Sequence, residues 1–151
     1  MNLHEIVSLD ELNMAPIITE LGEAFSFNGR MAKLKEELLD GAKIISYHVS
    51  DMLVAYAQYK FKTKEQIHFL SMQVHPDFRG GLILMNLIKK VLKALKREKY
   101  KTIVSSVHVN NEKSILFHLR LGFSETERSE NRIKFQITKQ KLETLLTNNW
   151  L

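Results

Sequence analysis

The chain has 151 residues, enough for one domain with a buried core. Its 44% hydrophobic and 26% charged residues are typical of a globular protein, and cysteine is absent, which excludes disulfides, thiolate metal sites and a cysteine nucleophile. The longest apolar run, Leu82–Met85, is far too short to span a membrane, and the first residues lack the apolar run of a signal peptide. We therefore expect a single cytoplasmic domain over residues 1–151, with no membrane partner.

The formal net charge of +5 raises the question of nucleic-acid binding. Six basic side chains gather on and just after one helix-like segment whose other positions are apolar, so they form its solvent-facing side. No aromatic residues alternate with them, as stacking on bases would require. We favour a solvated face over a nucleic-acid patch, and this charge would also attract an anionic cofactor. The six residues are Lys89, Lys90, Lys93, Lys96, Arg97 and Lys99.

The first forty residues predict a strand followed by two helices. Residues 3–8 are predicted as a short strand, and Leu9-Asp10-Glu11 as the start of a helix that Pro16 complicates. Apolar residues recur at helical spacing from Arg30 to Leu39, and Gly41 marks the end of that helix.

Three strands follow in the next part of the chain. Lys43–Val49 and Leu53–Phe61 are predicted to form a hairpin, with Ser50-Asp51 as its turn. Gln66–His75 is predicted as a third strand, which Pro76 ends.

Helices and strands then alternate to the end of the chain. A long amphipathic helix ending near Leu95 precedes a β-branched strand at Thr102–Val109, and Gly122 stops a helix at Glu112–Leu121. Arg132–Thr138 is predicted as a strand. A terminal helix is predicted from Gln140 to about Thr147, docked through Leu142, Leu145 and Leu146.

The predicted order is β-α-α-β-β-β-α-β-α-β, a mixed α/β fold around one sheet. The strand–helix–strand step over residues 66–109 should be a right-handed crossover between parallel strands. A phosphate-bearing ligand would then bind at the carboxyl end of the first strand, where the helix begins.

Residues 70–88 carry the strongest indication of a binding site. A strand, a proline-containing turn, Arg79-Gly80-Gly81 and the start of a helix follow without a gap. The first N–H groups of a helix have no partner within it, glycines let a pyrophosphate approach, and the arginine adds charge. The alternative explanation is a tight strand-to-helix turn that requires glycine.

Two segments resemble motifs of the Gcn5-related N-acetyltransferase (GNAT) superfamily. Val-x-Pro-x-x-Arg-Gly at residues 74–80 is similar to the start of its coenzyme A motif, and Asn-x-x-Ser-Ile-x-Phe-His-x-x-Leu-Gly-Phe at residues 111–123 is similar to its second motif. The resemblance covers residues 43–138. It implies a GNAT-like α/β (α+β) domain with a mixed, mostly antiparallel sheet, a splayed parallel pair and flanking helices. It also implies an N-acetyltransferase that moves an acetyl group from acetyl-CoA to a primary amine, of a small molecule or a protein, by direct attack.

The same resemblance implies roles for individual residues. His118 occupies the position where the family commonly has a tyrosine, so it would protonate the departing thiolate as the catalytic acid. A main-chain N–H of Val74 would stabilise the thioester oxygen. No metal is expected, because the histidines show no ligand spacing. The cofactor-binding set is Met72, Val74, Arg79, Gly80, Gly81, Leu82, Ile83, Leu84 and Asn111.

Departures from the family pattern leave a second interpretation open. Leu82 and Leu84 stand where the family motif has glycine and then glycine or alanine. The alternative is therefore a non-catalytic GNAT-fold binding or structural module that has lost coenzyme A binding.

The general base is not identified. Ser106 stands where some members carry a carboxylate, which leaves His68 and His75 as titratable candidates on the strand before the motif. The sequence also leaves open a homodimer, formed through an edge strand at Arg132–Thr138 or through the C-terminal segment ending in Trp150-Leu151.

Overall fold

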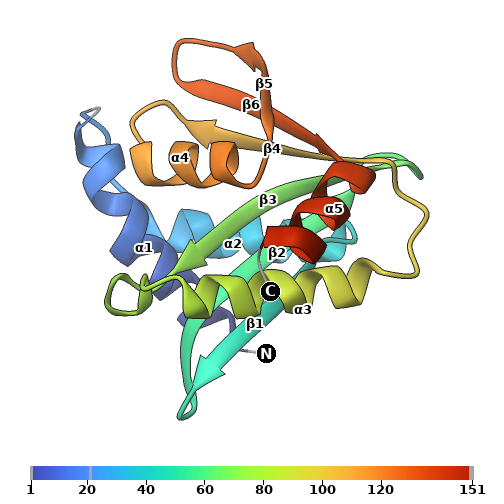
Figure 1. Ribbon diagram of the computed structural model, residues 1–151. Helices are drawn as coiled ribbons and strands as arrows, with labels where there is room; N and C mark the ends of the chain where they lie inside the picture. Colours follow the sequence, from blue (N-terminus) through green and yellow to red (C-terminus); the bar gives the residue numbers. More distant parts are fainter. Residues whose placement is uncertain (1, 21, 150–151) are drawn as a thin grey trace. The chain divides into compact units, whose positions relative to one another are not determined.

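The computed structural model describes residues 2–20 and 22–149 (Figure 1). The chain forms two compact units: the first unit comprises residues 1–59 and 71–97, and the second unit comprises residues 60–70 and 98–151. One six-stranded mixed sheet has the strand order β1-β2-β3-β4-β6-β5, and its strand β3 (Gln66–Val74) runs through both units. This is the α+β architecture with one parallel pair that the sequence predicts.

The first unit packs two helices on a β-hairpin. Helices α1 (Leu3–Glu20) and α2 (Phe27–Leu39) contact each other, strands β1 (Lys43–Val49) and β2 (Met52–Phe61) form the hairpin, and α3 (Leu82–Leu95) packs against β1. A cluster of buried side chains joins the helices to the hairpin: Ile6, Val7, Leu9, Leu34, Leu53 and Tyr56.

The strand predicted at residues 3–8 is wrong, because this segment is the first part of α1. Ile6, Leu9, Asp10 and Asn13 are buried at spacings of three and four, which places them on one face of a helix. The side chain of Asn2 accepts hydrogen bonds from the N–H groups that open the helix, those of His4 (3.1 Å) and Glu5 (3.4 Å). Neighbouring Ile6 and Val7 favour a strand locally, but tertiary packing and this cap decide for a helix.

The hairpin turn is confirmed at Ser50-Asp51. Both residues have positive φ, 49° and 66°, as the turn that matches the right-handed twist of a two-residue hairpin requires. Aspartate tolerates this conformation better than most residues, which explains its use here.

The second unit holds the parallel pair and the rest of the sheet. Strand β4 (Thr102–His108) pairs in parallel with β3 from Gln66↔Thr102 to Phe69↔Ser105, as predicted for the crossover. Helix α4 (Glu112–Arg120) follows, and the unit ends with β6 (Arg132–Thr138) and α5 (Lys139–Asn149). Leu142 of α5 is buried, as predicted.

A short strand that the sequence does not predict, β5 (Ser124–Arg128), pairs antiparallel with β6. Strand β6 therefore lies between β4 and β5, and the expectation that Arg132–Thr138 is an edge strand is wrong. The other segment considered for a homodimer, Trp150-Leu151, lies outside the described residues.

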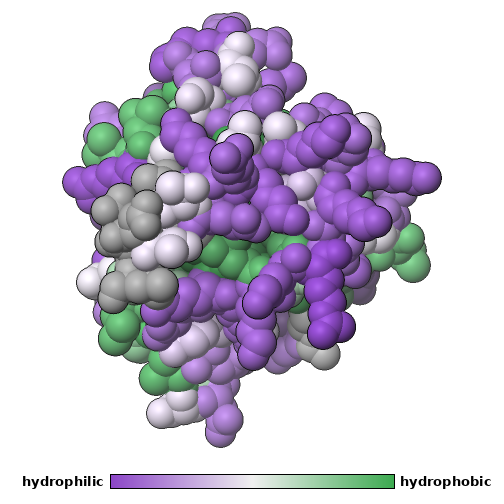
Figure 2. Space-filling model, turned by 45° about the vertical axis from the view of Figure 1, so that its right-hand side comes forward, coloured by the Kyte–Doolittle hydropathy of each residue, from purple (hydrophilic) through white to green (hydrophobic). Residues whose placement is uncertain are grey.

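The basic side chains of α3 and the residues after it are exposed, as predicted for a solvated face. Lys90 donates a hydrogen bond to the carbonyl oxygen of Ser46 at 2.7 Å, which ties one of them to β1. Hydrophilic side chains predominate over the face shown in Figure 2. Among the described residues no helix is long and apolar enough to cross a membrane.

Candidate active site

The start of α3 has free hydrogen-bond donors. After β3, a short 3₁₀ turn (Pro76–Phe78) leads through Arg79, Gly80 and Gly81 into the helix. The first helical hydrogen bond runs from Met85 N–H to the Gly81 carbonyl at 3.0 Å, and no side chain caps this helix end. The N–H groups of residues 82–84 are therefore available to an anion, and the helix dipole adds positive potential there.

The two glycines keep this helix end open. A Cβ atom built on Gly80 or Gly81 would meet no other atom within 4 Å, and Gly81 has φ +94°, a conformation that other residues rarely adopt. Leu82 has 68% of its surface exposed, whereas Leu84 is half-buried. The leucines that replace small residues of the family motif thus leave the space beside the glycines empty.

Arg79 is held by the protein on one side only. Its Nη2 donates to Asn13 Oδ1 at 2.9 Å, and its Nε donates to the Val74 carbonyl at 3.4 Å. The sequence suggested Asp77 or another carboxylate as its partner, but no described acidic side chain forms an ion pair with it. An exposed guanidinium without a carboxylate is suited to binding a phosphate.

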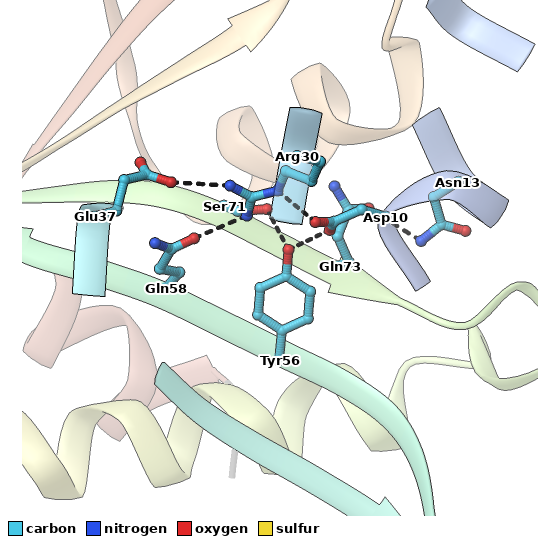
Figure 3. A network of polar contacts seen from close by, with 8 residues as sticks. All are labelled: Asp10, Asn13, Arg30, Glu37, Tyr56, Gln58, Ser71 and Gln73. Atoms are coloured by element: carbon cyan, nitrogen blue, oxygen red, sulfur yellow. Dashed lines mark hydrogen bonds and ion pairs between the residues drawn. The ribbon is translucent and has the colours of Figure 1, made fainter. Parts of the chain in front are cut away.

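A buried polar network lies behind this loop in the first unit (Figure 3). Asp10 of α1, only 3% exposed, accepts hydrogen bonds from Arg30 Nε at 2.7 Å and from the Tyr56 hydroxyl. The Tyr56 hydroxyl also bonds to Ser71 Oγ of β3 at 2.8 Å. Further contacts of Arg30 run to Glu37 Oε1 and Gln58 Oε1, both at 2.9 Å.

Burial dominates the electrostatics of this network. It raises the pKa of Asp10 above its usual 3.8, although the Arg30 charge and the hydrogen bonds oppose that rise. Burial and the Asp10 charge together raise the pKa of Tyr56, so its hydroxyl stays protonated and donates. Nε2 of Gln58 is buried and has no hydrogen-bond partner within the described chain. Because Asp10, Arg30 and Tyr56 are far apart in sequence, only the helical spacing of Asp10 among buried residues could have indicated this network.

Two further predicted site residues belong to the second unit. Asn111 Oδ1 accepts the Ser114 N–H at 3.2 Å and so caps the N-terminus of α4. His118 is 8% exposed: its Nδ1 lies 2.7 Å from the Ser114 carbonyl oxygen and its Nε2 lies 2.9 Å from Ser105 Oγ. These partners indicate a neutral ring that donates through Nδ1 and accepts from Ser105 at Nε2. Its ring also stacks on Phe135, with centroids 5.0 Å apart.

The match to a family model decides the classification. The model of the acetyltransferase (GNAT) family matches residues 16–123, more than half of the chain. The chain belongs to the GNAT family of acetyltransferases. The resemblance of residues 74–80 and 111–123 to GNAT motifs is thereby confirmed.

Solved GNAT structures share the fold at low sequence identity. The paia N-acetyltransferase of Thermoplasma acidophilum, in complex with coenzyme A, is 13% identical and has a TM-score of 0.74 over 90% of this chain and 92% of that one. The ribosomal-protein-alanine N-acetyltransferase of Brucella melitensis is 19% identical (TM-score 0.61; 89% and 91% covered). The N-acetyltransferase PseH of Campylobacter jejuni, in complex with acetyl coenzyme A, is 16% identical (TM-score 0.58; 74% and 79% covered). No curated protein matches the chain by sequence.

The GNAT positions considered for a general base carry engaged side chains. Ser106 Oγ accepts a hydrogen bond from Arg132 Nε at 2.7 Å. His75 Nδ1 accepts the Asp77 N–H at 3.1 Å and caps the 3₁₀ turn before the loop, while His68 also has interaction partners. No group of side chains in the described part of the chain could hold a metal ion.

The buried ring of His118 makes the stability of this GNAT protein depend on pH. Burial lowers the pKa of His118 below 6.5, against the opposing effect of the Ser114 carbonyl. The folded state therefore binds this proton more weakly than the unfolded state, so the neutral ring stabilises the fold above pH 6.5 and this stability is lost as the pH falls towards the folded pKa. We expect the free energy of unfolding, measured by urea denaturation, to fall more between about pH 7.5 and pH 5.5 in the wild type than in His118→Phe. Equal losses in the two proteins would contradict this role.

Proposed function

We propose that this GNAT protein is an N-acetyltransferase that transfers the acetyl group of acetyl-CoA to a primary amine by direct attack. The observation that carries the proposal is the uncapped start of α3, where the N–H groups of residues 82–84 face the open space beside Gly80 and Gly81. An acyl donor with a pyrophosphate fits such a site, because it needs several donors and close approach to the backbone. Family membership supplies the reaction class.

Residues of the first unit form the proposed donor site. Gly80, Gly81 and the N–H groups of Leu82, Ile83 and Leu84 would hold the pyrophosphate, and Arg79 would add a charged contact. Main-chain groups of Met72 and Val74 would pair with the pantetheine arm. The Val74 carbonyl is already bonded to Asn13 and Arg79, so the Val74 N–H is the group we assign to the thioester oxygen.

The reaction requires three things of the protein. An amine with an ordinary pKa near 10.4 must lose a proton before it attacks, the oxygen of the thioester carbonyl must be stabilised as it becomes negative, and the leaving sulfur must receive a proton. The thioester supplies an activated acyl group that reacts with a neutral amine without a covalent enzyme intermediate. We assign the second task to the Val74 N–H.

The roles of His118 and Asn111 remain predictions with a clear alternative. The contacts of His118 support a packing role, since its Nδ1 proton faces the Ser114 carbonyl and its Nε2 faces Ser105. If it is the catalytic acid, His118→Phe should lower kcat about 100-fold or more while the affinity for acetyl-CoA is unchanged. A fall in unfolding temperature with normal kcat would leave only packing. Asn111 caps α4, and its predicted contact with coenzyme A would show as weaker binding in Asn111→Asp, which keeps a capping oxygen.

The acceptor is tested with amines of different classes. We expect acetyl-CoA-dependent release of free thiol when a diamine, a lysine-containing peptide or a peptide with a free N-terminal alanine is added. Turnover with one class and not the others would identify the acceptor class. Acetyl-CoA binding without turnover on any of them would favour a GNAT module without catalysis.

A second function, a non-catalytic GNAT-fold module, is favoured by one observation. Leu82, at a position of the coenzyme A motif where the family has glycine, exposes 68% of its surface beside the proposed pyrophosphate site. If its side chain closes the site, the wild type will bind no acetyl-CoA and Leu82→Gly will restore binding. Tight binding by the wild type excludes this reading.

A further inference from the structure

The side chain of Asn13 joins α1 to the loop that carries Arg79. It is 9% exposed, although it belongs to a helix whose polar residues mostly face solvent. Its Nδ2 donates to the Val74 carbonyl and to Gln73 Oε1, both at 3.0 Å, while its Oδ1 accepts from Arg79 Nη2 at 2.9 Å. The amide thus bonds both the end of β3 and the arginine of the loop, and Figure 3 shows it directed towards Gln73.

The amide can adopt only one orientation in this environment. A flipped amide would place its oxygen against two acceptors, the Val74 carbonyl and Gln73 Oε1, and its NH₂ group against the guanidinium of Arg79. An aspartate would meet the same two acceptors with a charged oxygen. The site therefore selects asparagine over its isosteric acid.

The helix that presents Asn13 is itself anchored. Asp10 lies one helical turn earlier on the same face of α1 and is fixed by Arg30 and Tyr56. Side chains held by a rigid element and a surrounding hydrogen-bond network position their partners more accurately than side chains on a free loop. The position of Asn13 is therefore determined by the buried network and passed on to Arg79.

The contacts with Asn13 and Val74 leave one edge of Arg79 unused. A guanidinium carries five N–H donors in a planar fork. Its Nε and one Nη2 donor point to the Val74 carbonyl and to Asn13, and the residue is exposed and lacks a carboxylate partner. The remaining donors are arranged for a bidentate contact with a phosphate.

We propose that Asn13 is a positioning residue that holds Arg79 ready to bind the pyrophosphate of coenzyme A. This inference rests on the proposed function, since it assumes that coenzyme A binds at the start of α3. Without Asn13 the guanidinium keeps its charge but must lose side-chain freedom each time the ligand binds, which weakens the affinity.

A double-mutant cycle on coenzyme A affinity tests this role without knowledge of the acceptor. We expect Asn13→Ala to weaken binding about 10-fold and Arg79→Ala to weaken it about 30-fold, because a charged contact contributes more than its positioning bond. The double variant should bind like Arg79→Ala alone, since Asn13 acts only through the arginine. Asn13→Asp, which keeps the size of the side chain, should also weaken binding because it neutralises the guanidinium.

The controls separate positioning from folding and from absence of the site. Leu12→Ala changes an exposed neighbour on α1 and should leave the affinity unchanged. Circular dichroism and the unfolding temperature identify any variant that fails to fold, and Asn13→Asp then replaces Asn13→Ala in the cycle. Additive losses, or an unchanged or tighter affinity in Asn13→Ala, would overturn the proposal, the latter because Asn13 would then compete with the ligand for Arg79. Absence of binding by the wild type would instead refute the proposed function.

Discussion

Replacement of Asp10 by alanine is expected to lower the free energy of unfolding by about 3–5 kcal/mol, because it leaves the Arg30 charge without its buried partner. The loss also removes the acceptor of the Tyr56 hydroxyl and one connection between α1, α2 and β2. Chemical denaturation monitored by circular dichroism measures this difference.

Conservative variants distinguish the charge from the packing. Tyr56→Phe keeps the aromatic ring and the Asp10–Arg30 pair, so we expect a smaller loss of about 1–3 kcal/mol. Leu12→Ala, on an exposed part of the same helix, should cost less than either. A loss below about 1 kcal/mol for Asp10→Ala would contradict the view that this network fixes α1.

The second large effect is expected at Gly80. Gly80→Glu should weaken acetyl-CoA binding at least about 100-fold, because a carboxylate at the start of α3 would repel the pyrophosphate and occupy the space it needs. Calorimetric titration of folded protein with acetyl-CoA measures this loss.

Gly80→Ala is the matched control for that substitution. Its Cβ would meet no atom within 4 Å, and the backbone of Gly80 does not adopt positive φ, so the variant should fold normally. Binding that is weakened in the glutamate variant and mostly kept in the alanine variant locates the pyrophosphate at this loop. Unchanged binding in Gly80→Glu would place coenzyme A elsewhere.

Local patterns were enough to predict most of the core of the fold. Strands β1 and β6 have the predicted bounds, because alternating or β-branched residues between clear turn signals define them. Helix α1 was missed because its β-branched residues outweighed the signal of Asn2 followed by Glu5, which resembles a capping box. Every residue of β5 is exposed, so no hydrophobic period marks the strand, which forms only through its pairing with β6.

The candidate site divides along the same line. The open start of α3 was predictable, since glycines and a helix N-terminus are local features. The contact between Asn13 and Arg79 was not, because it joins residues 66 positions apart. The burial of His118 among aromatic side chains likewise depends on Phe135, which belongs to another element. Motif positions therefore indicate candidates, whereas their roles depend on the partners that the fold supplies.

The most direct test of the proposed donor site is the thermal unfolding of the wild-type protein with and without acetyl-CoA. A ligand at about 100 times its dissociation constant adds about 2.7 kcal/mol of stability. For a domain of this size we therefore expect the unfolding temperature to rise by several degrees. No rise at millimolar acetyl-CoA would contradict the assignment of the α3 start as an acyl-CoA site and leave a GNAT fold with a different role.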